Sequence, residues 1–433
     1  MPKIIPPAFV VSIVTLISLG LFTTAPVAFA QRVAEATAKA AEKAASQAPA
    51  QERLRPEIAK SLQAAQAMLT MKQYKEAMAK IIETDLVANR TPYELFIIER
   101  MRGTAAAALD DNLVSAKSFE AVVATNRLTP AERILFSEAI TAAHYNLKDY
   151  KTAALWAARA IKEGSTQAQV RMLQIQSSFL ADDIEAARNE TNAWLEANEK
   201  AGVVSTEDLL KMSGRIALKQ KDPASYLAAL QKLVANYPNK NYWADWIARV
   251  AVSANMTDRY MKDVFRLQLA LGDNLTQSQY MFLAKTAMEA GFPIDAKQIL
   301  DHGFDAKVLG LIAEQKTLRD KATREAADDV KNMPRTSAEA ALLKTGPALF
   351  NSGLNFAISG DKPKGIAMME EGIKRLSTKP LEDAKLRLGI TYALAGDGEK
   401  AINILTPLRG QDGLTEVAML WTAYAKQLKK PAS

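Results

Sequence analysis

Cysteine is absent from the 433-residue sequence, and histidine occurs only twice, as His144 and His302. The first absence excludes disulfides, thiol catalysis, cysteine-ligated metals and lipid attachment to cysteine. Neither histidine has a second histidine at metal-ligand spacing, and no H-E-x-x-H pattern is present. We therefore predict a structural role for both histidines and no metal site.

Other catalytic signatures are missing as well. The sequence contains neither the G-x-S-x-G pattern of a nucleophile elbow nor a P-loop, and no carboxylate pair stands out as a glycosidase site. The stretch from Gly396 to Ala401 matches a relaxed dinucleotide fingerprint, but that motif needs a preceding strand, and here both flanks predict helices. We expect a turn there, no cofactor and no enzyme activity.

Aromatic residues are also scarce, at 7%, whereas apolar residues reach 48% and alanine is abundant. This composition favours helices that pack through small side chains. The net charge of +7 is spread along the chain, as expected of ordinary solvated helix faces, although a role toward an anionic polymer or membrane surface stays open. No basic cluster is interleaved with aromatic residues, so we expect no binding to nucleic acid.

The one long apolar run lies near the N-terminus. Lys3 precedes the run Ala8–Phe22, and Ala28-Phe29-Ala30 places small residues at the two positions that a signal peptidase reads. We predict that residues 1–30 are a signal peptide, cleaved between Ala30 and Gln31. An uncleaved anchor is the alternative, but the run is short for a bilayer and prolines flank it. The expected location is therefore the periplasm, with no stable membrane anchor after cleavage.

Residues 31–55 are rich in alanine and charged residues but have no wide apolar stripe. We predict a linker here. A short coiled-coil segment is the alternative, which the small size of the apolar side chains disfavours.

A repeated pattern follows from residue 56 onward, and its clearest copy runs from Leu388 to Ala401. In that copy a small residue, Gly389, is followed one turn later by Tyr392, then by a Gly-Asp-Gly turn and by Ala401 on a second helix. Equivalent alanines recur near a 34-residue period, at Ala77, Ala116, Ala153 and Ala187. Gly353, Phe356, Asp361 and Gly365 form the preceding copy, in which Gly365 replaces the alanine.

This pattern resembles the tetratricopeptide repeat (TPR), and the chain as a whole resembles exported bacterial TPR proteins of unassigned activity. The resemblance implies an all-α fold, a right-handed α-solenoid of helix–turn–helix repeats. We predict an N-terminal repeat block over residues 56–302 and C-terminal repeats over residues 337–433 that end in a helix, Thr415–Leu428, with a polar outer face. Between them, residues 303–336 predict a charged bridging helix, Lys307–Met333, closed by Pro334.

In TPR proteins the first helix of each repeat lines a concave groove that binds peptides. By that register Phe350, Leu354, Leu386 and Ile390 would face the groove, although apolar residues at this spacing also fit a core. The resemblance implies a scaffold or adaptor that binds proteins or peptides of the cell envelope. The alternative is an accessory protein of polysaccharide export or cell-wall assembly that binds an anionic glycan.

Overall fold

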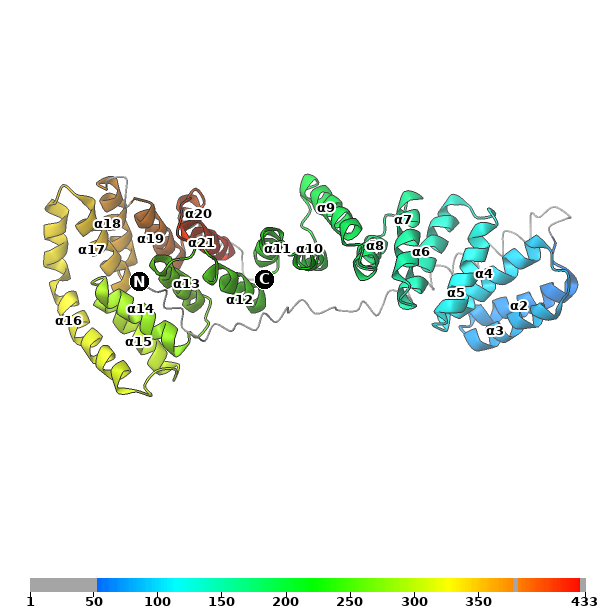
Figure 1. The fold of residues 1–433 in the computed structure, drawn as a ribbon, viewed down its shortest axis with the longest axis horizontal. Helices are drawn as coiled ribbons and strands as arrows, with labels where there is room; N and C mark the ends of the chain where they lie inside the picture. The colour runs from blue at the N-terminus through cyan, green and yellow to red at the C-terminus, as the bar shows by residue number, and fades with distance from the viewer. Residues whose placement is uncertain (1–52, 377–380, 429–433) are drawn as a thin grey trace. The chain divides into compact units, whose positions relative to one another are not determined.

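The computed structural model describes residues 53–376 and 381–428, and every regular element in these ranges is a helix (Figure 1). The predicted all-α helical-repeat class is therefore confirmed. The described chain divides into two compact units, residues 53–229 and residues 230–428, at a point inside one helix, α11 (Pro223–Asn236). The signal peptide and most of the linker that the sequence predicts lie outside the described residues.

The N-terminal unit consists of successive antiparallel helix pairs. The pairs preceding α11 are α2 (Pro56–Thr70) with α3 (Tyr74–Glu83), α4 (Pro92–Ala108) with α5 (Asn112–Ala124), α6 (Pro130–Asn146) with α7 (Tyr150–Lys162), and α8 (Ala168–Leu180) with α9 (Ile184–Lys200), followed by α10 (Glu207–Lys219). A short 3-10 helix, η2 (Thr84–Leu86), continues α3. The repeat alanines Ala77, Ala116, Ala153 and Ala187 are all buried at contacts between helices.

The turns inside these pairs share one backbone design, which the turn of α6 and α7 illustrates. Lys148 adopts a left-handed conformation with φ of 62°, and the Asp149 N–H donates to the carbonyl oxygen of His144 at 3.0 Å. This is the Schellman arrangement that ends a helix. The Asp149 carboxylate then accepts from the Thr152 N–H at 3.3 Å, so one aspartate closes α6 and caps α7.

The C-terminal unit contains the rest of the helices. They are α12 (Lys240–Ala251), α13 (Asp258–Ala270), α14 (Gln277–Glu289), α15 (Pro293–Asp305), α16 (Ala313–Leu342), α17 (Gly346–Ser359), α18 (Lys362–Lys374), α19 (Leu381–Leu394), α20 (Gly398–Leu405) and α21 (Leu414–Leu428).

The last helix folds back onto the start of this unit, so that α21 lies beside α13 (Figure 1). Trp421 on α21 is fully buried, and its indole Nε1 donates to the Asp263 carbonyl oxygen at 3.0 Å. The main-chain N–H and the side-chain hydroxyl of Thr257 also both donate to the Asp412 carbonyl oxygen. The sequence predicted an end helix here, but it did not predict this closure. The unit thus differs from an open array.

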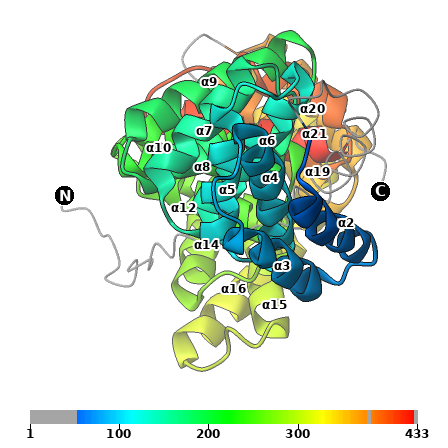
Figure 2. The same cartoon turned by 90° about the vertical axis from the view of Figure 1, so that its right-hand side faces the viewer.

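The charged helix α16 extends past the proline that the sequence predicted as its end. It begins at Ala313 and ends at Leu342, with Pro334 inside it. Proline removes one main-chain donor from the helix. Close to it, the Thr336 hydroxyl donates to the carbonyl oxygen of Asn332 at 3.2 Å. Ala326 and Met333 are buried against the neighbouring helices α15 and α17, and this packing holds the helix together. Helix α16 lies next to α15 (Figure 2).

Helices α17 and α18 approach each other through glycines. A Cβ atom on Gly365 would lie 2.5 Å from the Ala357 main-chain nitrogen, and one on Gly353 would lie 2.6 Å from the Gly365 carbonyl oxygen. The glycine that departs from the repeat pattern at position 365 therefore has a steric cause.

No helix among the described residues is long and apolar enough to cross a membrane.

The sequence predicted two repeat blocks, which end at residue 302 and begin again after residue 336. This division of the repeats stays a prediction. The compact units divide elsewhere, because α12 to α15 pack with the C-terminal helices rather than with the N-terminal repeats.

Candidate functional site

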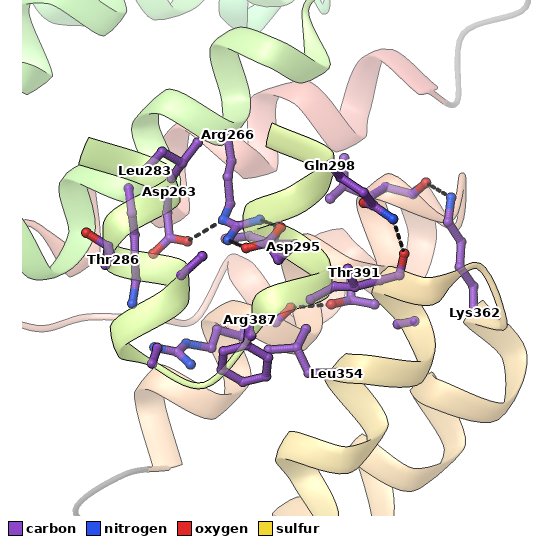
Figure 3. Close-up of a pocket in the computed structure, with 18 residues that line it drawn as sticks. Asp263, Arg266, Leu283, Thr286, Asp295, Gln298, Leu354, Lys362, Arg387 and Thr391 are labelled. Atoms are coloured by element: carbon purple, nitrogen blue, oxygen red, sulfur yellow. Dashed lines mark hydrogen bonds and ion pairs between the residues drawn. The ribbon is translucent and has the colours of Figure 1, made fainter. Parts of the chain in front are cut away.

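A cavity of about 310 Å³ lies within the C-terminal unit, where helices distant in sequence meet (Figure 3). Its walls come from α13, α14, α15, α17 and α19, with Lys362 at the start of α18. Much of the lining is apolar, including Leu283, Phe292, Leu354 and Ile390. Concave, largely apolar cavities with a few polar groups are the usual form of a small-molecule site.

An ion pair forms one part of the lining. Arg266 on α13 donates through both terminal nitrogens to the Asp295 carboxylate on α15, with a distance of 2.9 Å from Nη1 to Oδ1. The Asp295 side chain is only 7% exposed, and the pair is bidentate, the strongest geometry for arginine with a carboxylate. The nearby carboxylate raises the pKa of Arg266 against the opposing effect of its burial. This arginine is thus charged and already paired.

Asp263, one turn before Arg266, has a very different environment. Its side chain is 6% exposed, and its carboxylate lies 4.0 Å from Arg266 Nε, too far for a strong hydrogen bond. Burial raises the pKa of Asp263, while the positive charges of Arg266, Lys262 and Arg387 oppose that rise. The carboxyl group is therefore a buried acid without a close partner among the described residues.

Two cations at the cavity lack partners as well. Among the described residues, no hydrogen bond or ion pair within 4.0 Å involves the Lys262 ammonium or the Arg387 guanidinium, although both side chains are half-buried. Burial lowers the pKa of Lys262, and the positive charge of Arg387 lowers it further. The two side chains are thus close enough to repel each other. A third cation, Lys362, donates from Nζ to the Leu394 carbonyl oxygen at 2.7 Å.

The apolar residues that the sequence assigned to a partner groove divide into two groups. Leu354 and Ile390 line the cavity. Phe350 and Leu386 are buried outside its lining, and the Phe350 main chain lies against Gly372. Their role in binding a partner stays a prediction, and Ala30 and Gln31, at the predicted cleavage site, lie outside the described residues.

Lys262, Asp263, Arg266 and Arg387 are the functional candidates that sequence reasoning missed. In sequence they are charged residues on amphipathic helices, with no motif around them. Only the closure of the unit brings α13 next to α19 and makes them a site.

The two histidines have ordinary structural partners. His144 Nε2 lies 2.9 Å from Glu120 and Nδ1 lies 3.1 Å from Asp149, while His302 Nδ1 lies 2.7 Å from the hydroxyl of buried Tyr280. Within residues 53–376 and 381–428, no group of three or more histidine, aspartate or glutamate side chains is arranged to hold a metal ion.

Known proteins are similar to this chain in structure rather than in sequence. No protein-family model matches the sequence. No curated protein matches it either. Among solved structures, the chain is similar to Naa15/Naa10 bound to HypK-THB, with 10% identity, a TM-score of 0.32, and coverage of 89% of this chain and 69% of that one. It is also similar to the P58(IPK) TPR domain, with 15% identity, a TM-score of 0.21, and coverage of 86% of this chain and 99% of that one. At these scores neither similarity supports a functional argument, so the class, an all-α helical-repeat protein, rests on the helix pairs described above.

Proposed function

We propose that this chain is an exported scaffold protein of the periplasm, which binds other envelope proteins and has no catalytic activity of its own. The observation that carries the proposal is the array of successive helix pairs, α2 to α9, in the N-terminal unit. Such arrays present long surfaces along which a peptide or a partner helix can lie. The signal-peptide pattern of residues 1–30 supports export.

Helix α7 offers a defined surface on which to test partner binding. Leu155 is 71% exposed there, and the Arg159 guanidinium lies 4.8 Å from the centre of the neighbouring Trp156 ring. Tryptophan and arginine are among the residues enriched at the energetic centres of protein interfaces, and Leu155 adds exposed apolar surface beside them. A protein partner would therefore contact this part of the array.

The test places a photo-crosslinking amino acid at position 155 of the full-length chain, expressed in a Gram-negative bacterium. We expect discrete protein adducts in the envelope fraction, and none from a control carrying the same probe at exposed Lys316. If position 155 yields no protein adduct, or the same products as position 316, this surface does not bind a partner.

Export has its own test. Mass spectrometry of the protein from the periplasmic fraction should find a mature N-terminus at Gln31. A chain that keeps its apolar N-terminal run, or that stays in the cytoplasmic fraction, would contradict this part of the proposal.

The net charge of +7 favours a second candidate function, binding of an anionic glycan in polysaccharide export or cell-wall assembly. Binding to an immobilised acidic polysaccharide that weakens as salt is added would support it. Failure to bind even at low salt would eliminate it, because charge attraction between exposed groups is strongest there.

A further inference from the structure

The cavity of the C-terminal unit contains an uncompensated positive charge. Its lining has four cations, Lys262, Arg266, Lys362 and Arg387, against two carboxyl groups, Asp263 and Asp295. Arg266 and Asp295 neutralise each other in their bidentate pair. Because burial also raises the pKa of Asp263, that acid compensates its surroundings only in part. The positive charge that remains comes chiefly from Lys262 and Arg387.

Lys262 and Arg387 form an unfavourable arrangement while the cavity is empty. They come from α13 and α19, both are half-buried, and each lacks a counter-ion within 4.0 Å among the described residues. Two like charges in a partly buried site repel each other more strongly than they would in water. An anion bound between them would remove that repulsion and gain charge-assisted hydrogen bonds.

The other side of the cavity is suited to an apolar group. Leu283, Phe292, Leu354, Ile358, Ile390 and Leu394 contribute hydrocarbon surface to the same cavity. A volume of about 310 Å³ corresponds to about ten water molecules at about 30 Å³ each. That space suits a small organic molecule rather than a folded polymer or a nucleic acid.

We propose that this cavity binds a small amphipathic organic acid, whose anionic group lies between Lys262 and Arg387 and whose hydrocarbon part contacts the apolar wall. Octanoate is a suitable probe, since it has a carboxylate and a chain of the right size. The site lies within the C-terminal unit and does not depend on the scaffold function proposed above. A free acid and a lipid share this chemistry, and probes of different chain length distinguish them.

The experiment measures binding of octanoate to the purified chain by isothermal titration calorimetry. For a ligand of this size we expect a dissociation constant on the order of 0.1 to 1 mM. Neutral 1-octanol and cationic octylammonium have the same chain and should bind at least about tenfold more weakly. The octanol hydroxyl has no negative charge to pair with the two cations, and the ammonium group has no acceptor and is repelled by them. A palmitate probe that binds no more tightly than octanoate indicates a free small acid, and one that binds much more tightly indicates a lipid.

Charge variants locate the anion in the cavity. Lys262→Met and Arg387→Met should each weaken octanoate binding about tenfold and leave octanol unchanged. Asp263→Asn should strengthen octanoate binding, since it removes the one poorly paired negative charge. The matched control, Lys316→Met on α16, removes an exposed lysine outside the lining and should have no effect.

Loss of binding through misfolding is recognisable in the same samples. Lys262→Met relieves the repulsion between the two cations, so its melting temperature without ligand should equal or exceed that of the wild-type chain. The proposal is overturned if octanoate and octylammonium bind equally, if both methionine variants bind octanoate like the wild type, or if octanoate does not bind.

Discussion

At the scale of single residues, the turns of the N-terminal unit share one backbone conformation without sharing one residue type. Lysine and aspartate occupy positive-φ positions in the turns at Lys72, Asp110, Lys148, Asp182 and Lys221, with φ between 56° and 64°. The corresponding turns in the C-terminal unit have Gly360 and Gly396. The repeat alanines indicated in the sequence where the first four of these turns lie. The sequence could not show the left-handed backbone, because lysine carries no signal for it.

Lys148 provides a test of this backbone requirement. A β-branched residue is strained in the left-handed region, so Lys148→Val should lower the free energy of unfolding by about 1–2 kcal/mol, whereas Lys148→Gly should be neutral or slightly stabilising. Urea unfolding followed by circular dichroism measures both. The control is Lys151→Val in the first turn of α7, where only helix propensity changes, by about 0.5 kcal/mol. Equal losses at the two positions would show that backbone strain at Lys148 does not matter.

The buried Glu94 carboxylate gives a pH-dependent prediction at the same scale. It accepts from Arg55 Nε at 2.9 Å and from the Thr91 N–H at 2.8 Å, and its side chain is fully buried. The hydrogen bond from Arg55 is the largest cause that lowers the pKa of Glu94 to about 2. A carboxyl group with a lowered pKa stabilises the fold above its unfolded pKa, and this contribution disappears as pH falls toward the folded pKa.

Glu94→Gln should therefore destabilise the N-terminal unit at about pH 7 by about 1 kcal/mol or more, since a charged cap and its buried partner bonds are lost. The difference from the wild type should shrink as pH falls from 4.5 toward about 2, where Glu94 itself becomes protonated. Urea midpoints measured across this range provide the data. A difference that stays constant with pH would mean that the charge of Glu94 contributes nothing.

At the scale of helices, the sequence predicted a chain of helix–turn–helix repeats, because apolar periodicity and turn residues are local signals. It was wrong about the end of α16, where proline was taken as a stop. The helix continues through Pro334 because Ala322, Ala326, Met333 and Ala340 are buried along it. Packing with α15 and α17 outweighs the lost hydrogen bond, and no local pattern reveals that packing.

The glycine contact between α17 and α18 leads to a prediction at this scale. Gly365→Ala would place a methyl group 2.5 Å from the Ala357 main-chain nitrogen, which can move only with its helix. We expect a loss of about 1–3 kcal/mol in the free energy of unfolding of the C-terminal unit, despite the better helix propensity of alanine. Ala367→Ser, on the exposed side of α18, is the matched control and should change stability by less than about 0.5 kcal/mol. A Gly365→Ala variant as stable as the wild type would show that the two helices can separate at no cost.

At the scale of the whole molecule, the closure of the C-terminal unit and its cavity are what the sequence could not predict. The contacts that close the unit join α13 with α21, and a local repeat pattern says nothing about pairs so far apart. The resemblance to TPR proteins implied an open groove that includes Leu354 and Ile390, and their binding of a partner stays a prediction. Both residues line the cavity, but the sequence did not single out Lys262 and Arg387, which line it too. A repeat register identifies apolar positions on a helix. It does not identify charged residues that become neighbours only when the array closes.

Trp421 tests whether the two compact units respond independently. Its side chain is fully buried on α21, packs edge-on against Tyr424 and donates to the main chain of α13. Replacing it with alanine leaves a large cavity and removes one buried hydrogen bond, so Trp421→Ala should cost about 3–5 kcal/mol. The loss should be confined to the C-terminal unit, because Trp421 belongs to that compact unit. Hydrogen exchange followed by mass spectrometry should then show reduced protection from α12 to α21 and unchanged protection from α2 to α9.

The same variant should bind octanoate more weakly, since α13 and its Lys262 lose their support. Reduced protection over the whole chain would instead mean that the two units unfold as one cooperative body, and the closure of the C-terminal helices would then stabilise the repeat array as well.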